Sequence, residues 1–186
     1  MTVEVARRRF TVEDYYRMAK AGILTEDDRV ELIEGEIVQI APIGSRHAAG
    51  VKTLIHLFAP PIHGRALIGA QDPLHLSEFS EPEPDFVLLR PRDDHYAAAH
   101  PGPADLLLLV EVSDTTLAYD REVKLPLYAR AGVPEVWIED LASRALDVYQ
   151  EPSTEGYRRV RRLVSGDRVG PQLFPDISLA VDDLLP

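Results

Sequence analysis

The sequence predicts a mixed α/β (α+β) fold, in which helices flank a mixed central β-sheet. Segments 85–90 and 105–112 carry almost uninterrupted apolar runs, which is typical of strands that are buried on both faces. Segments with helical spacing precede and follow these two, and shorter β-prone segments come later in the chain. With 186 residues, 45% of them apolar, we expect a single domain that spans residues 1–186.

The N-terminal part predicts a helix followed by a hairpin. A helix over residues 11–21 is indicated by Thr11 as its cap, by Asp14 at the capping-box position and by Gly22 after its end. Residues 30–40 form two β-prone runs on either side of a glycine, Gly35. This arrangement predicts two strands joined by a tight turn.

A second helix is expected over residues 45–58. Ser45 can cap it, its apolar residues fall at helical spacing, and Pro60 and Pro61 are expected to end it. A strand over residues 65–70 follows. These elements lead into the first of the two apolar strands.

Residues 91–104 are rich in proline, alanine and polar side chains, so we expect a loop inserted within the domain between two strands. A helix is predicted over residues 119–131, ended by Gly132. Pro126 inside it predicts a kink or a late start.

Three further strands are predicted at residues 135–139, 145–150 and 157–164. The last of these carries arginines on both faces, which favours an edge strand or a protruding hairpin. Those arginines, with Arg7, Arg8 and Arg9, are basic strips in a chain whose net charge is −11. That charge argues against extended nucleic-acid binding, although bound divalent cations can offset acidic side chains locally.

The composition also limits where the protein works. The absence of cysteine excludes disulfides, thiolate nucleophiles and cysteine-based zinc sites, and it agrees with a reducing compartment. The N-terminus lacks the apolar stretch of a signal peptide, and the longest apolar run, residues 106–110, is too short to cross a membrane. We therefore expect a cytoplasmic protein without membrane association.

Two carboxylates occupy strand ends where acids are costly. Asp85 opens one apolar strand after Pro84, and Glu111 closes the next, so adjacent strands would bring them together. A buried charge needs a partner, and Mg²⁺ or Mn²⁺ suits such oxygen ligands. The alternatives are that Asp85 only caps its own backbone and that Glu111 lies at the surface.

Lys124 is the basic residue expected near these acids. On the helix that follows, it could orient an attacking water or stabilise negative charge on a phosphoryl group. It could equally be an exposed lysine in an ion pair with Asp120, four residues earlier. We interpret Asp120 as a helix cap and Tyr128 as a core residue.

These residues stand in a pattern that resembles the Uma2 family, part of the PD-(D/E)xK restriction-endonuclease-like group. The resemblance covers residues 11–150 or so, and its most specific part is YDREVKLPLYARAGVPEVW at residues 119–137. It also includes Pro84-Asp85, Glu111-Val112-Ser113, residues 30–36 (VELIEGE) and Ser45-Arg46-His47.

The resemblance implies a restriction-endonuclease-like core with Asp85 and Glu111 as metal ligands. The parent motif has a lysine two positions after its second acid, but Ser113 stands there in this chain. Lys124 would then reach the same point from the helix. Glu31 would line the site as a further acid and His47 would support it. Otherwise Glu31 belongs to a solvated acidic hairpin and His47 is a surface or core residue.

The implied function is a metal-dependent endonuclease that hydrolyses phosphodiester bonds in nucleic acid, DNA in preference to RNA, with Mg²⁺ or Mn²⁺ as cofactor. A homodimer is a further expectation, because nucleases that cut both strands of a duplex often pair two sites. The alternative is a catalytically inactive nuclease-fold module that binds protein or nucleic acid. The net charge of −11 favours that alternative.

Overall fold

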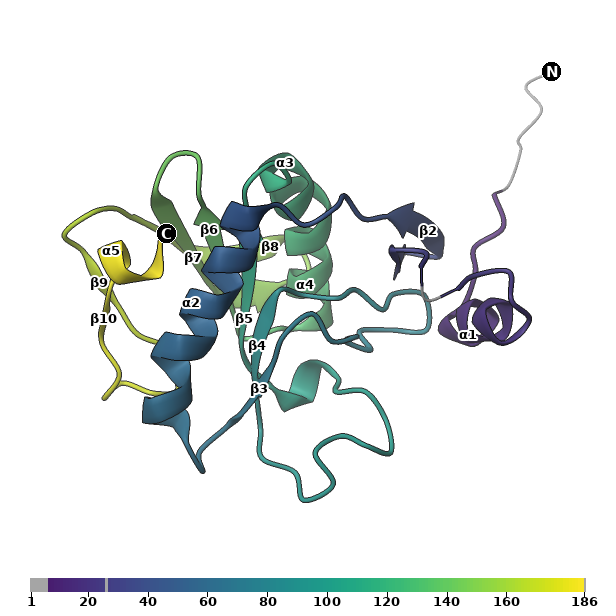
Figure 1. Cartoon of the computed structure of the whole chain (residues 1–186), viewed down its shortest axis with the longest axis horizontal. Coiled ribbons are helices and arrows are strands. Elements are labelled where there is room, and N and C mark those ends of the chain that lie inside the picture. Colours follow the sequence, from purple (N-terminus) through teal and green to yellow (C-terminus); the bar gives the residue numbers. More distant parts are fainter. Residues whose placement is uncertain (1–6, 26, 186) are drawn as a thin grey trace.

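The computed structural model describes residues 7–25 and 27–185. The expectation that the N-terminus lacks a signal peptide involves the first six residues, which lie outside the described ranges. At its centre is a six-stranded sheet with the order β3-β4-β5-β6-β7-β8 (Figure 1). Only β5 and β6 pair in parallel, and the other neighbours are antiparallel. The predicted mixed sheet is therefore confirmed. The strands are β3 (Leu67–Gly69), β4 (Phe86–Leu89), β5 (Leu106–Ser113), β6 (Glu135–Asp140), β7 (Ala145–Ser153) and β8 (Gly156–Leu163).

Helices cover both faces of this sheet, which explains the uninterrupted apolar runs of its inner strands. On one face, α2 (Ser45–Ile62) packs over β3, β4 and β5, and α5 (Val181–Leu184) packs against α2 (Figure 1). There Phe58 of α2 contacts the rings of Phe86 and Trp137. On the other face, α4 (Leu125–Ala131) packs against β7 and β8.

The N-terminal elements form as predicted. Helix α1 (Val12–Lys20) begins with a complete capping box between Thr11 and Asp14. The hairpin of β1 (Val30–Ile33) and β2 (Glu36–Gln39) turns through Glu34 and Gly35, whose φ angles are 50° and 83°. Both residues adopt left-handed conformations, as a tight hairpin turn requires. A backbone bridge from Leu32 to Glu81 holds the hairpin against the rest of the chain.

The second helix starts at Ser45 as predicted, but its predicted cap and its predicted end are wrong. Gly44, not Ser45, is the N-cap of α2, and the helix continues through Pro60 and Pro61 to Ile62. Proline costs a helix its backbone donor, but at an exposed last turn that loss is small. Burial of Ile62, which is 2% exposed and belongs to the core, favours the extra turn.

The third helical region starts earlier than predicted and is not uniform. It comprises α3 (Leu117–Tyr119), the π-helical segment η2 (Asp120–Lys124) and α4, which ends at Gly132 as predicted. The π-helical segment ends two residues before Pro126. Its turn is wider than an α-helical turn, and the Leu125 N–H bonds to the Asp120 carbonyl across it. The regular helix thus starts late, one of the two outcomes that Pro126 predicted.

The remaining elements complete the sheet and the C-terminal end. Residues 91–104 connect β4 to β5 and end in a short 3-10 turn, η1 (Pro103–Asp105). The prediction of an edge strand is confirmed for β8, which is last in the sheet order. We did not predict β9 (Arg168–Val169), β10 (Leu179–Ala180) or α5, which are too short to carry periodicity. No helix in the described part of the chain has the length and apolar character to cross a membrane.

Candidate functional site

A pocket of about 350 Å³ opens at the end of the sheet where β5 finishes and β4 begins. One side is formed by the β1–β2 hairpin and residues 40–44, and another by residues 114–124. All five residues singled out from the sequence line this pocket: Glu31, His47, Asp85, Glu111 and Lys124.

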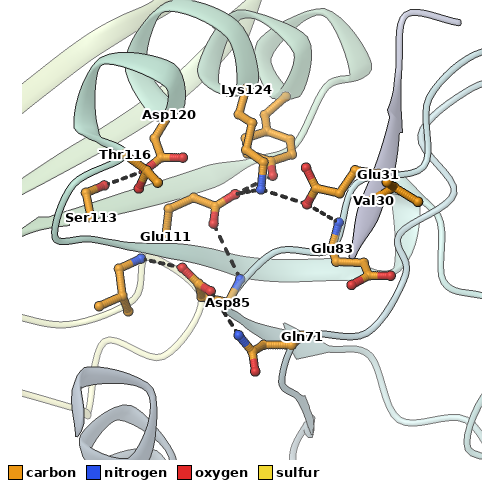
Figure 2. A network of polar contacts seen from close by, with 12 residues as sticks. Val30, Glu31, Gln71, Glu83, Asp85, Glu111, Ser113, Thr116, Asp120 and Lys124 are labelled. Carbon is orange, nitrogen blue, oxygen red and sulfur yellow. Dashed lines mark hydrogen bonds and ion pairs between the residues drawn. The ribbon is translucent and has the colours of Figure 1, made fainter. Parts of the chain in front are cut away.

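Lys124 extends from the end of the π-helical segment to lie between two carboxylates (Figure 2). Its amine is 3.0 Å from Oε1 of Glu31 and 3.2 Å from Oε1 of Glu111. The residue is 6% exposed and Glu31 is 2% exposed. Lys124 is therefore not an exposed surface lysine, and Glu31 does not belong to a solvated acidic hairpin.

Glu111 lies on β5 at the floor of the pocket. Its Oε1 also accepts a hydrogen bond of 2.5 Å from the Tyr128 hydroxyl, and its Oε2 accepts a long one of 3.4 Å from the Asp85 N–H. Burial raises the pKa of Glu111 well above its usual range; Lys124 opposes this, and Asp85 adds to it. Burial thus favours the protonated form of the Glu111 carboxyl, whereas Lys124 favours its ionised form.

The Asp85 side chain, directly before β4, contacts both β5 and helix α2. Its Oδ2 accepts a 2.8 Å hydrogen bond from the Val112 N–H, and its Oδ1 lies 2.8 Å from Nε2 of His47. The contact with Asp85 raises the pKa of His47, although burial opposes the shift. Asp85 therefore binds a neighbouring strand and a helix rather than capping its own backbone.

Asp120 is buried on the helical wall of the pocket, where its Oδ2 accepts hydrogen bonds from Ser113 at 2.6 Å and from Thr116 at 2.7 Å. Burial raises the pKa of Asp120, and the Ser113 hydroxyl opposes that shift. Ser113, two residues after Glu111, therefore holds a further acid at the pocket (Figure 2).

Tyr119 has a hydroxyl group without a hydrogen-bond partner in the described part of the chain. Its ring lines the pocket, and its buried hydroxyl makes no hydrogen bond with any residue in the described ranges. Burial, with Glu31 adding to it, raises the pKa of Tyr119 to about 12. The hydroxyl therefore keeps its proton at neutral pH and can donate a hydrogen bond.

Sequence reasoning missed part of this site. Asp120 was interpreted as a helix cap and Tyr128 as a core residue; Tyr128 is indeed buried, but its hydroxyl bonds to Glu111. A signal existed for Asp120, because it stands four residues before Lys124 and so shares its side of a helix. Tyr119 carried no comparable signal.

The donor chemistry suits a hard divalent cation, because Glu31, Asp85, Glu111 and Asp120 line one pocket with Lys124. Two further acids, Glu83 and Asp114, line the same pocket, whereas its only lysine or arginine residues in the described part of the chain are Arg29 and Lys124. Within residues 7–25 and 27–185, however, no three histidine, aspartate or glutamate side chains are already arranged to hold a metal ion. The residues fit Mg²⁺ or Mn²⁺ by type and charge, and side chains would have to rotate on binding.

Comparisons with known proteins agree with this fold. The family model Uma2, described as "Putative restriction endonuclease", matches residues 12–182. A solved structure, described as a putative nuclease belonging to DUF820 from Anabaena variabilis ATCC 29413, superimposes with a TM-score of 0.73 at 16% identity, covering 94% of this chain and 97% of its own. No curated protein sequence matches the chain. The predicted family resemblance and fold class are thus confirmed.

Proposed function

Because this chain belongs to the Uma2 family, we propose that it is a metal-dependent endonuclease that hydrolyses phosphodiester bonds in DNA. The observation that carries the proposal is the buried amine of Lys124, held between Glu31 and Glu111 in a pocket that Asp85 also lines. Desolvating an amine and several carboxylates is costly, so such a cluster is typical of a functional site.

Asp85 and Glu111 would hold Mg²⁺ or Mn²⁺, which supplies a bound water of lowered pKa and charge compensation at the phosphate. Lys124 orients the attacking water or stabilises the negative charge that develops on the phosphoryl oxygens. Its position favours this role, because its amine lies directly beside the carboxylate of Glu111.

Glu31, His47 and Tyr128 position the groups that react. Glu31 fixes the Lys124 amine from the hairpin side and accepts the Glu83 N–H at 2.8 Å, which limits its own movement. His47 holds one oxygen of Asp85, and Tyr128 holds one oxygen of Glu111. These contacts limit the orientations that the two carboxylates can take.

A second candidate is a nuclease-fold module that binds without cutting, which the net charge of −11 favours. The two candidates differ in what the pocket does with a cation. A working nuclease gains thermal stability from Mn²⁺ through the pocket carboxylates, by linkage. Thermal stabilisation by Mn²⁺ that binds only to the acidic surface would not depend on Glu111.

The deciding experiment is a cleavage assay with Mn²⁺ or Mg²⁺ on supercoiled plasmid, single-stranded DNA and RNA. The parent is compared with Glu111→Gln and with Glu139→Gln as a matched control. Glu139 is also a buried carboxyl, on the neighbouring strand β6, but it does not line the pocket. We expect metal-dependent cleavage that only Glu111→Gln abolishes. No cleavage by the parent, or equal cleavage by the Glu111→Gln protein, refutes the proposal.

A further inference from the structure

Part of the lining of this pocket is apolar rather than acidic. This apolar wall comes from β2 and the connection to α2, and it consists of Val38, Ile40, Pro42 and Ile43. Ile43 is 38% exposed. Neither metal binding nor phosphodiester hydrolysis uses an apolar surface, so the proposed reaction leaves the wall unexplained.

The proposed reacting groups line this pocket and are almost fully buried. Asp85, Glu111 and Lys124 are 8%, 2% and 6% exposed. A phosphodiester that reaches them through this pocket enters the space beside the apolar wall. A volume of about 350 Å³ lies at the small end of the range for small-molecule pockets, and such a space can take a nucleotide but not a double helix.

Arg29 is a second cation in the lining of this pocket. It is exposed, and within the described ranges no acidic side chain forms an ion pair with it. Its charge is nevertheless felt nearby, because burial raises the pKa of Glu83 and Arg29 opposes that shift. The pocket thus combines an apolar surface, an exposed guanidinium and a floor of acids with one lysine. A nucleotide has the matching parts, namely a flat base, a flanking phosphate and the reacting phosphodiester.

We propose that this pocket accepts a single unpaired nucleotide, so that the substrate is single-stranded or locally unpaired DNA. The base lies against the apolar wall, Arg29 contacts the flanking phosphate, and the next phosphodiester reaches the floor. The inference rests on the proposed function and adds its substrate class. In a duplex, the bases are stacked inside and a polar backbone would face Val38, Ile40 and Ile43.

Charge supports the same choice of substrate. A duplex carries both strands' phosphates along one axis, and a chain with a net charge of −11 repels it more strongly than it repels one strand. Contact between a base and the apolar wall removes apolar surface from water, and this contribution to affinity does not depend on charge.

The test uses three labelled DNA substrates of one sequence: a single strand, a perfect duplex, and a duplex with a central unpaired bubble. Rates are measured with Mn²⁺. We expect the single strand to be cut at least about tenfold faster than the duplex, and the bubble substrate to be cut within its unpaired segment. A duplex cut as fast as the single strand overturns the inference and leaves the proposed nuclease function intact.

A binding measurement tests the inference independently of catalysis. Fluorescence anisotropy with the Glu111→Gln protein, without added metal, should show tighter binding of the single strand than of the duplex. Equal or weaker binding of the single strand overturns the inference, whether or not any substrate is cut. If the parent cuts nothing while the single strand is still preferred, the nuclease proposal fails and the nucleotide site stands.

Ile43→Ser tests the apolar wall, with Ile23→Ser as its control. Ile23 is an isoleucine with 69% exposure outside the pocket, so both changes remove a partly exposed aliphatic surface. We expect Ile43→Ser to raise KM for the single strand several-fold with little change in kcat, and to weaken single-strand binding equally. Parental affinity in the Ile43→Ser protein contradicts the role of the wall.

Discussion

The amine of Lys124 lies 3.2 Å from Oε1 of Glu111, and both residues are almost completely buried. Burial alone would lower the pKa of Lys124, but Glu111 and Glu31 outweigh it and raise that pKa well above its usual range. Lys124 therefore stays charged and acts as the internal cation of the pocket. The stability of the site and its chemistry thus depend on the same pair.

Replacing Lys124 with methionine should separate its contribution to stability from its proposed contribution to cleavage. Glu31 and Glu111 would then face each other without a cation, and breaking a buried ion pair costs about 3–5 kcal/mol. We expect that loss in urea unfolding without metal, partial recovery with Mn²⁺, and no cleavage. Lys52→Met, on the exposed side of α2, is the control and should change stability by less than about 0.5 kcal/mol. A Lys124→Met protein as active as the parent contradicts the assigned role.

Glu139 makes stability depend on pH. It is fully buried, and neither carboxylate oxygen has a hydrogen-bond partner among the described residues. Burial, followed by the charge of Asp85, raises its pKa well above the ordinary 4.5. Above that ordinary value the native state holds a proton that the unfolded state has released, so Glu139 makes the unfolding free energy fall as pH rises.

Glu139→Gln removes this contribution. We expect the variant to gain stability over the parent as pH rises from 5 to 8, by at most about 1.4 kcal/mol per pH unit. Urea unfolding at both pH values measures the difference. A stability difference that is the same at pH 5 and pH 8 would mean that Glu139 titrates normally.

Gly50 should resist replacement by alanine, although it lies inside a helix. Alanine is favoured over glycine there by about 1 kcal/mol. A Cβ at Gly50, however, would lie 2.7 Å from Cγ1 of Val112 and 3.4 Å from Oε2 of Glu139. Val112 is fully buried on a central strand and its branched side chain has few other rotamers. We therefore expect Gly50→Ala to lower stability by about 1–3 kcal/mol.

The double variant Gly50→Ala/Val112→Ala checks the cause of that loss. With Val112 shortened, the added methyl group has room, so the two changes together should cost less than the sum of their separate effects. Additive losses in thermal unfolding would show that the close approach of α2 to β5 does not depend on Gly50.

Tyr119 and Tyr128 should respond differently to the loss of their hydroxyls. Tyr128→Phe removes the 2.5 Å hydrogen bond to Glu111 and should cost about 1.5–3 kcal/mol. Tyr119→Phe removes a buried hydroxyl that has no partner among the described residues, so it should leave stability unchanged or raise it. Equal destabilisation by both changes would show that the Tyr119 hydroxyl has a partner.

The sequence by itself determined the features that depend on neighbouring residues. The capping box of Thr11 and Asp14, the turn at Gly35 and the helix end at Gly132 follow from local backbone preferences. The apolar runs predicted the buried strands, because only strands covered on both faces need them. The positions of Asp85 and Glu111 at the ends of adjacent strands predicted that they would meet.

The tertiary structure decided how the groups of the site contact one another. Glu31 lies 93 residues before Lys124, and no local pattern joins the two. The extension of α2 to Ile62, the hydrogen bond from Tyr128 to Glu111 and the apolar wall above the acids likewise arise from contacts between distant segments. Periodicity shows which face of an element is buried. The partner buried against it is set by how whole elements pack, and that information is spread over the entire chain.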